Sequence, residues 1–402
     1  MTRPGLRRPA GTEQRATWLE LFYDLVFVFA VTQVSHHLLD DLTWRGAGQS
    51  ALLLLVVWWS WNYTTWVTNE LDPESPVVRL LMIALMLASL LMAAALPDAF
   101  GSEAGLFVGS YLAIQIGRHT FLTFVAAGPG TLERERAGRI LVWFVAAGVF
   151  WIGGAVADGT ARTVLWLIAL AIDYGAPLAL YRIPGRPFPA GESAWEVSTA
   201  HFSERFALFV IIALGESIVI TGATVSGAEL DAPILAAFAT AFLTTAAMWW
   251  LYFTYVARIA ERRLELAPNR TRMARDAYTY LHVVLVAGII VSAVGDELVI
   301  AHPSEPLEDA EVAAVVAGPA IYLVAHVLFR LRLTSTVSWR RLAGAAGCVV
   351  AGFLFGDADA LVLALIVLAV LITVIGAETL AAARRARRGE PSPLERLEAT
   401  AG

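Results

Sequence analysis

The feature that most constrains this chain is a series of long apolar runs, separated by short polar segments, that continues along nearly the whole sequence. A helix rises 1.5 Å per residue, so runs of roughly 20 residues match the hydrocarbon thickness of a bilayer. Hydrophobic residues make up 58% of the 402 positions and charged residues only 16%, well below the content of a soluble domain. The sequence therefore predicts an all-α fold, a polytopic transmembrane helical bundle.

Glycine, proline and charged residues divide the chain into about twelve predicted spans. Two pairs of spans are separated by only a few residues and predict tight helical hairpins. The spans are residues 17–38, 48–67, 77–96, 104–127, 139–157, 161–181, 201–223, 232–256, 274–299, 310–331, 340–356 and 359–383.

The distribution of arginine predicts the orientation of these spans, because cytoplasmic loops retain positive charge during insertion. All 29 basic residues are arginine, and alternating the loops places 25 of them on one side. Only Arg45 and Arg162 fall on the opposite side, while Arg118 and Arg205 lie inside spans. We therefore expect a multi-pass protein of the cell inner (plasma) membrane with both termini cytoplasmic and a first span that is retained.

Similar motifs recur in the same order about 185–200 residues apart, which predicts an internal repeat. The run that begins at Glu20 corresponds to the run that begins at Glu204, and the tryptophan cluster 58–61 corresponds to residues 249–252. Six spans per half is an even number, so the two six-helix repeats would be parallel. The expected parts are a cytoplasmic tail (1–16), a first repeat (17–183), a cytoplasmic linker (184–200), a second repeat (201–385) and a second cytoplasmic tail (386–402).

Several classes of function have no support in the sequence. The net charge is −6 and no basic patch is interleaved with aromatic residues, so nucleic-acid binding is not expected. One cysteine, Cys348, cannot form a disulfide framework or a cysteine metal site. The chain also lacks a phosphate-binding loop, a metal-binding helix motif and a nucleophile elbow. We expect no enzymatic activity, no metal and no cofactor; the expected partners are the lipid bilayer and an unidentified small solute or ion, and self-association to a homo-oligomer stays open.

Charged side chains inside the predicted spans are the candidates for function, because an ionised group costs on the order of 3 kcal/mol at the centre of a bilayer. Glu20 and Asp24 in the first span are four residues apart and share one helical face. Two close carboxylates cannot both ionise cheaply in a dry site. One of them should therefore bind and release protons unless Arg118 or Arg205 neutralises the pair.

The seventh span carries a second group of candidates. His201 and Glu204 share a face at the cytoplasmic end, beside Arg205, and Glu216 lies about 18 Å further along the helix. Gly215 predicts a close approach by a neighbouring helix. Polar residues of the fourth and sixth spans could complete an interior path, among them Gln115, Arg118, His119 and Asp173. A satisfied structural pair is the competing interpretation for Arg118 and Asp173.

Two long motifs resemble the bacterial low temperature requirement protein A family. They are the run Glu-Leu-Phe-Tyr-Asp-Leu-Val-Phe-Val-Phe-Ala-Val at 20–31, followed by the tryptophan cluster 58–61, and the run at 201–216 that contains His-Phe-Ser-Glu-Arg-Phe and ends in Leu-Gly-Glu. The resemblance covers nearly the whole chain. It implies a multi-pass bacterial membrane protein whose family name refers to growth in the cold. The characteristic residues map to Glu20, Asp24, His201, Glu204, Arg205 and Glu216, without a catalytic or ligand role.

The leading hypothesis is a secondary transporter coupled to protons or cations. Two parallel halves with carboxylates in the first helix of each half are the architecture that alternating access requires. In this hypothesis Glu20, Asp24 and Glu204 carry the proton or cation, Glu216 lies deeper in the path, and Arg118 or Arg205 sets their charge. The alternatives left open are an ion channel with six-helix repeats, and a membrane stress-response scaffold or intramembrane enzyme.

Overall fold

The computed structural model describes nearly all of the chain and is helical throughout the part it describes. The described residues are 6–7, 15–186, 197–226, 230–254 and 256–399. Within them, two isolated bridges, Arg7–Leu71 and Pro306–Asp359, are the sole extended pairings, and no strand is formed. The all-α fold class is therefore confirmed. Most of the expected tail 1–16 and linker 184–200, and the last three residues of the tail 386–402, lie outside the described residues.

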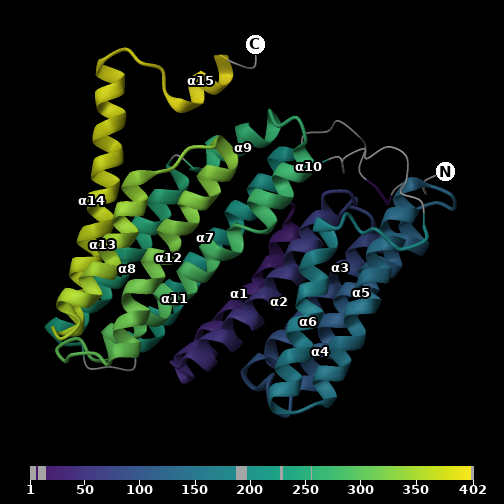
Figure 1. The fold of residues 1–402 in the computed structure, drawn as a ribbon, viewed down its shortest axis with the longest axis horizontal. Coiled ribbons are helices and arrows are strands. Elements are labelled where there is room, and N and C mark those ends of the chain that lie inside the picture. Colours follow the sequence, from purple (N-terminus) through teal and green to yellow (C-terminus); the bar gives the residue numbers. More distant parts are fainter. Residues whose placement is uncertain (1–5, 8–14, 187–196, 227–229, 255, 400–402) are drawn as a thin grey trace. The chain divides into compact units, whose positions relative to one another are not determined.

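The helices group into two compact units (Figure 1). Unit 1 comprises residues 1–37 and 48–198, and unit 2 comprises residues 38–47 and 199–402. The elements of unit 1 are α1 (Trp18–Asp40, whose last turn groups with unit 2), α2 (Trp44–Thr68, whose first turn does so), α3 (Pro76–Ala94), η1 (Leu96–Asp98), α4 (Ala104–Phe121), η2 (Leu122–Ala126), α5 (Leu132–Val156) and α6 (Gly159–Leu178).

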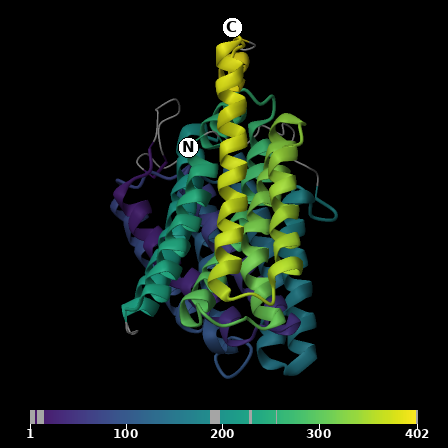
Figure 2. The same ribbon diagram turned by 90° about the vertical axis from the view of Figure 1, so that its left-hand side faces the viewer.

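Unit 2 contains a second series of long helices and four short ones among its described residues. Its elements are α7 (Thr199–Ser226), α8 (Ala232–Phe253), α9 (Val256–Glu265), α10 (Arg270–Met273), η3 (Ala274–Thr279), α11 (His282–Ala301), α12 (Asp309–Thr334), α13 (Trp339–Phe355), α14 (Ala360–Arg387) and α15 (Pro393–Ala399). The helix α14 extends past the other helices of this unit, and α15 returns from its end to pack on α9 (Figures 1 and 2).

Among the described residues, nine helices are long and apolar enough to cross a membrane. The predicted count of about twelve is not confirmed, because α2, α4 and α13 are not among the nine. The helix α13 has only 17 residues, and α4, with 18, carries the polar residues Gln115, Arg118 and His119 in its second half. The helix α2 has 25 residues, but it begins with polar positions and carries Asn62 and three threonines toward its end.

Helix boundaries follow from local hydrogen bonding that apolar periodicity does not report. Thr131 accepts a hydrogen bond from the backbone N–H of Arg134, so α5 begins seven residues before the apolar run that predicted it. Asp231 caps α8 in the same way, through the N–H of Ile234. A reciprocal capping box between Glu308 and Glu311 starts α12. Polar first turns are therefore part of these helices.

Close helix packing in unit 2 depends on glycines of α11 and α12. A Cβ atom at Gly318 of α12 would lie 2.4 Å from the backbone nitrogen of Ser292 of α11, and one at Gly288 would lie 2.6 Å from the backbone nitrogen of Tyr322. By contrast, a Cβ at Gly215 would meet nothing within 4 Å. The expected close approach at Gly215 is wrong; the close contacts are at Gly288 and Gly318, each of which packs against the backbone of the facing helix.

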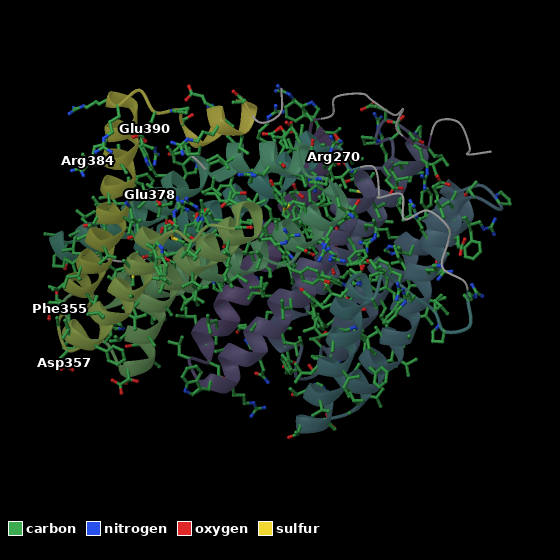
Figure 3. All side chains as sticks on the ribbon, turned by 45° about the horizontal axis from the view of Figure 1, so that its top comes forward. Arg270, Phe355, Asp357, Glu378, Arg384 and Glu390 are labelled. Atoms are coloured by element: carbon green, nitrogen blue, oxygen red, sulfur yellow. The ribbon has the colours of Figure 1, made fainter. Side chains whose placement is uncertain are left out.

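The two ends of unit 2 differ in charge (Figure 3). Arg270, Arg384 and Glu390 lie at one end, and Asp357 lies at the other, next to Phe355. The short helix α9 adds Arg258, Arg262 and Arg263 to the basic end. This separation follows the arginine asymmetry of the loops.

Candidate functional site

The interior of unit 1 holds a hydrogen-bonded polar network that joins α1, α2 and α4. Trp61 of α2 donates its indole N–H to the carboxylate of Asp24 at 2.8 Å. One turn further along α2, the hydroxyl of Thr64 accepts hydrogen bonds from the Tyr23 hydroxyl at 2.8 Å and from the Arg118 guanidinium at 2.7 Å. All five side chains are buried. Asp24 is thus bound by Trp61, while Arg118 and Tyr23 share the hydroxyl of Thr64 one turn further along the same helix.

The helix α4 carries further polar residues of this network on a single face. The guanidinium of Arg118 also donates to the side-chain oxygen of Gln115, one turn earlier. Tyr111 lies one turn before Gln115, so the three positions form a line of about 10 Å. His119 hydrogen-bonds through Nδ1 to the backbone carbonyl of Gln115 at 2.9 Å. The fourth span thus places Gln115, Arg118 and His119 in the interior of unit 1; whether they form a path for a solute or ion stays a prediction.

Asp173 of α6 lies at the other end of that line. Its Oδ2 atom accepts hydrogen bonds from the Tyr111 hydroxyl at 2.6 Å and from the indole N–H of Trp151 at 2.9 Å. The side chain is 2% exposed, and Oδ1 has no hydrogen-bond partner. Among the described residues, no arginine or histidine lies within ion-pair distance of this carboxylate. Asp173 is thus a buried acid held by two neutral donors.

Glu20 has a local structural role at the start of α1. Its carboxylate accepts hydrogen bonds from the backbone N–H of Thr17 at 2.9 Å and from the Thr17 hydroxyl at 2.8 Å. The Glu20 N–H in turn reaches the Thr17 hydroxyl at 3.4 Å. This reciprocal arrangement caps the start of α1. The spacing Thr-x-x-Glu was visible in the sequence and is the signal of such a cap.

The predicted residues of the seventh span all lie on α7 in unit 2. His201, Arg205 and Glu216 are buried, and Glu204 is half-buried. The neighbouring positions of the same helix pack on η3 and α11: the Ser203 hydroxyl lies 3.1 Å from the Tyr278 hydroxyl. The structure thus holds ionisable groups of α7 in a buried environment.

Comparison with known proteins identifies the family. The model of the bacterial low temperature requirement A protein (LtrA) family matches residues 15–376. The chain belongs to the LtrA family. An uncharacterised protein of Rhizobium meliloti (strain 1021) is 36% identical over 334 residues, which cover 83% of this chain and 81% of that protein. No solved structure matches. Together with the apolar helices, the family assigns this LtrA chain to the multi-pass membrane proteins.

Aromatic residues of this LtrA chain play a part that sequence reasoning underestimated. Trp58, Trp59 and Trp61 are fully buried. They pack inside unit 1, where Trp61 binds Asp24. Trp249 and Trp250 are 45% and 48% exposed, as a belt position requires.

Unit 2 contains a buried aromatic cluster around two histidines. The Tyr252 hydroxyl lies 2.9 Å from Nε2 of His282, and the ring of Tyr278 stacks on the His282 ring with centroids 4.9 Å apart. His326 lies edge-on to Tyr322 at 4.6 Å. These contacts make His282 and His326 part of the packed core of unit 2.

A buried ion pair in unit 2 was missed by sequence reasoning. Arg341 of α13 donates from Nε and Nη2 to the two carboxylate oxygens of Glu378 of α14, each at 2.9 Å, and also to the carbonyl of Leu251. The glutamate in the otherwise apolar run of α14 was the available signal. In the part of the chain described, no group of three or more His, Cys, Asp or Glu side chains is arranged to hold a metal ion.

Proposed function

We propose that the protein is a secondary transporter that moves a small solute or ion in exchange or in company with protons or another cation. The observation that carries the proposal is Asp173, a carboxylate buried in a membrane-spanning helix without a basic partner among the described residues. Such a group is costly in a bilayer unless it holds a proton or a cation. A residue with this property can load and release the coupling ion.

The polar side chains that follow Asp173 along one face of α4 support a path rather than an isolated acid. Tyr111 contacts Asp173 directly, and Arg118 joins Gln115 on α4 to Thr64 on α2. Hydroxyl groups can both donate and accept, so Tyr111 and Thr64 suit the transfer of a proton between neighbours. The second carboxylate oxygen of Asp173, Oδ1, accepts no hydrogen bond from the described residues and can therefore accept one from a solute or bind an ion.

The proposal extends to the architecture. Each unit holds six long helices in sequence order, α1–α6 in unit 1 and α7, α8 and α11–α14 in unit 2. This supports about twelve spans arranged as two parallel six-helix repeats. The basic end of unit 2, with the arginines of α9 and α14, supports cytoplasmic termini in the inner membrane. In the proposal, the ionisable residues of α7 serve the second repeat as Asp24, Arg118 and Asp173 serve the first. These residues are His201, Glu204, Arg205 and Glu216.

Proteoliposomes that contain a pH-sensitive dye test this proposal. A panel of amino acids, sugars, organic acids and monovalent cations is added outside, and proton flux is recorded. We expect at least one solute to drive saturable proton movement. An ohmic proton current that needs no solute would instead indicate a channel, and no flux with any member of the panel would contradict transport.

Variants separate the proposed coupling residue from a structural one. Asn can still accept the hydrogen bonds of Tyr111 and Trp151, so Asp173→Asn should fold normally and lose proton coupling. Glu204→Gln should also abolish or uncouple the flux. The matched control is Asp158→Asn, because Asp158 is an exposed carboxylate at the start of the same helix, 96% exposed. Wild-type proton coupling in Asp173→Asn would remove Asp173 from the mechanism.

A further inference from the structure

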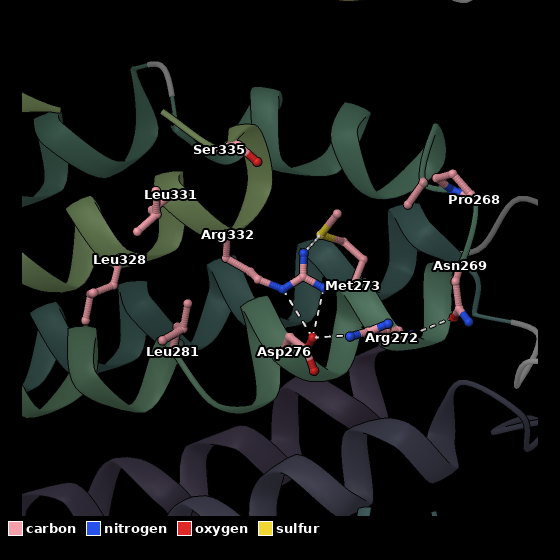
Figure 4. A pocket seen from close by; sticks show the side chains of 11 residues that line it. Pro268, Asn269, Arg272, Met273, Asp276, Leu281, Leu328, Leu331, Arg332 and Ser335 are labelled. Atoms are coloured by element: carbon pink, nitrogen blue, oxygen red, sulfur yellow. Dashed lines mark hydrogen bonds and ion pairs between the residues drawn. The ribbon is translucent and has the colours of Figure 1, made fainter. Parts of the chain in front are cut away.

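We propose that unit 2 carries a binding site for one anionic phospholipid, in the pocket between η3 and the C-terminal end of α12 (Figure 4). The pocket has a volume of about 670 Å³. Arginine side chains form one wall, and leucine side chains from α12 and from the segment before α11 form another. A phospholipid headgroup with the first part of an acyl chain needs this combination of walls.

The basic wall is a fixed array with more positive than negative charge. The Oδ2 atom of Asp276 accepts hydrogen bonds from Nε and Nη2 of Arg332 at 3.2 and 2.8 Å. Its Oδ1 atom accepts from Nε of Arg275 at 2.8 Å, and Nε of Arg272 lies 3.8 Å from Oδ2. Among the residues that line the pocket, Arg272 and Arg332 face the one carboxylate of Asp276, which leaves a surplus of one positive charge. The surplus attracts an anion.

Two of these arginines keep donors available for a ligand. The Arg272 side chain is 70% exposed and Arg332 is 33% exposed, and both line the pocket. Figure 4 shows their guanidinium groups on either side of Asp276. A phosphodiester between them would receive charge-assisted hydrogen bonds from both, which are the strong class of hydrogen bond.

The apolar wall continues onto the outer surface of a membrane-spanning helix. Leu328 and Leu331 of α12 are 39% and 43% exposed and line the pocket with Leu281. The helix α12 is one of the nine candidate spans and ends at Thr334, one turn beyond these leucines. Arg332 therefore lies where the helix leaves the hydrocarbon, the level at which lipid phosphates lie.

The arginine wall and the leucine wall belong to one pocket, and this combination favours a lipid over a soluble anion. Inorganic phosphate would contact the arginines alone and would leave the exposed leucines in contact with solvent or detergent. A phospholipid satisfies the charge with its headgroup and covers Leu328 and Leu331 with an acyl chain. The site does not depend on the transport proposal, since its residues lie outside the polar network of unit 1.

Native mass spectrometry of the delipidated full-length protein tests the proposal. Phosphatidylglycerol and phosphatidylcholine with identical acyl chains are titrated separately, and inorganic phosphate is added as a competitor. We expect one phosphatidylglycerol to be retained at low lipid-to-protein ratio, phosphatidylcholine to bind at least tenfold more weakly, and phosphate not to displace the lipid. Equal retention of the two lipids, or displacement by phosphate at concentrations comparable to the lipid, would overturn the site.

Three variants locate the site. Arg272→Gln should weaken phosphatidylglycerol binding about tenfold, because one charge-assisted contact is lost. Leu328→Gln, at an already exposed position, should weaken the binding of the lipid through the apolar wall. Arg340→Gln is the control, because Arg340 is an exposed arginine of the next helix that does not line the pocket. Wild-type affinity in both pocket variants would refute the assignment, and thermal unfolding confirms that each variant is folded.

Discussion

Individual arginines in this chain have different structural roles. The role depends on whether the side chain is buried and on which acceptors surround it. Arg162 at the start of α6 is 6% exposed and donates to the carbonyls of Gly154, Ala157, Phe100 and Gly101. It thereby closes the C-terminal end of α5 and fixes the segment before α4. Arg45 is predicted to lie on the same side of the membrane, but its side chain is exposed. Arg162 differs from Arg45 because it is buried against several backbone acceptors, and the sequence alone does not show this difference.

We expect Arg162→Ala to lower the free energy of unfolding by about 3 kcal/mol, because several buried carbonyl oxygens lose their donor. Arg45→Ala should change it by less than about 0.5 kcal/mol, as for an ordinary surface position. Equilibrium unfolding in mixed detergent micelles measures both. Equal effects of the two substitutions would show that Arg162 has no capping role.

Asp98 gives a pH-dependent prediction in the segment between α3 and α4. The Ser102 hydroxyl and the Ser102 backbone N–H donate to its carboxylate at 2.6 and 2.7 Å, and these bonds lower the pKa of Asp98 below its ordinary value of 3.8. A lowered folded-state pKa contributes stability above the unfolded pKa and loses it as pH falls through the folded pKa. Thermal unfolding of wild type and Asp98→Asn should therefore differ at pH 6, and the difference should shrink as pH falls below 4. A difference that grows on acidification would contradict the assignment.

At the scale of helices, the apolar runs predicted the position of every long helix, whereas the contacts between helices had to come from packing. The start of α5 was missed because Thr131, Glu133 and Glu135 are polar although they belong to the helix. The burial of Asp24, Arg118 and Asp173 was predictable from their cost in a membrane. Their partners were not, since Trp61 and Tyr111 belong to other helices and are common core residues. Packing geometry, rather than periodicity, brings these groups together.

The glycine contacts between α11 and α12 make a prediction about helix packing. Gly318→Ala should destabilise unit 2 by about 1–3 kcal/mol, because the added Cβ would meet the backbone of Ser292 at 2.4 Å and the helices would have to separate. Gly376→Ala in α14 is the control, since a Cβ there meets nothing within 4 Å, and it should be neutral or stabilising. Thermal unfolding compares them; equal effects would exclude the close contact.

For the whole molecule, the proposed parallel repeats make equivalent loops face the same side of the membrane. Glu103 follows the third long helix of unit 1, and Glu305 follows the third long helix of unit 2; both side chains are exposed. The native Cys348 is buried, so single cysteines can be introduced without removing it. These two loops therefore report whether the repeats are parallel or inverted.

We expect Glu103→Cys and Glu305→Cys both to react with a membrane-impermeant maleimide on intact cells. Glu390→Cys, at the basic end of unit 2, should react only after the cells are permeabilised. Labelling of one of the two loops but not the other would indicate inverted repeats. Labelling of Glu390→Cys from outside would reverse the proposed orientation.

The length of α13 has a consequence for the surrounding lipid. Its 17 residues span about 26 Å, less than the roughly 30 Å of an average hydrocarbon layer, while the neighbouring α14 has 28 residues. Exposed aromatic residues mark both ends of α13, with Trp339 at its first position and Phe353 and Phe355 at its last turn. Acyl chains beside this helix must therefore compress or tilt, whereas those beside α14 need not. As a bilayer thickens, the side of unit 2 at α13 would therefore be strained before the side at α14.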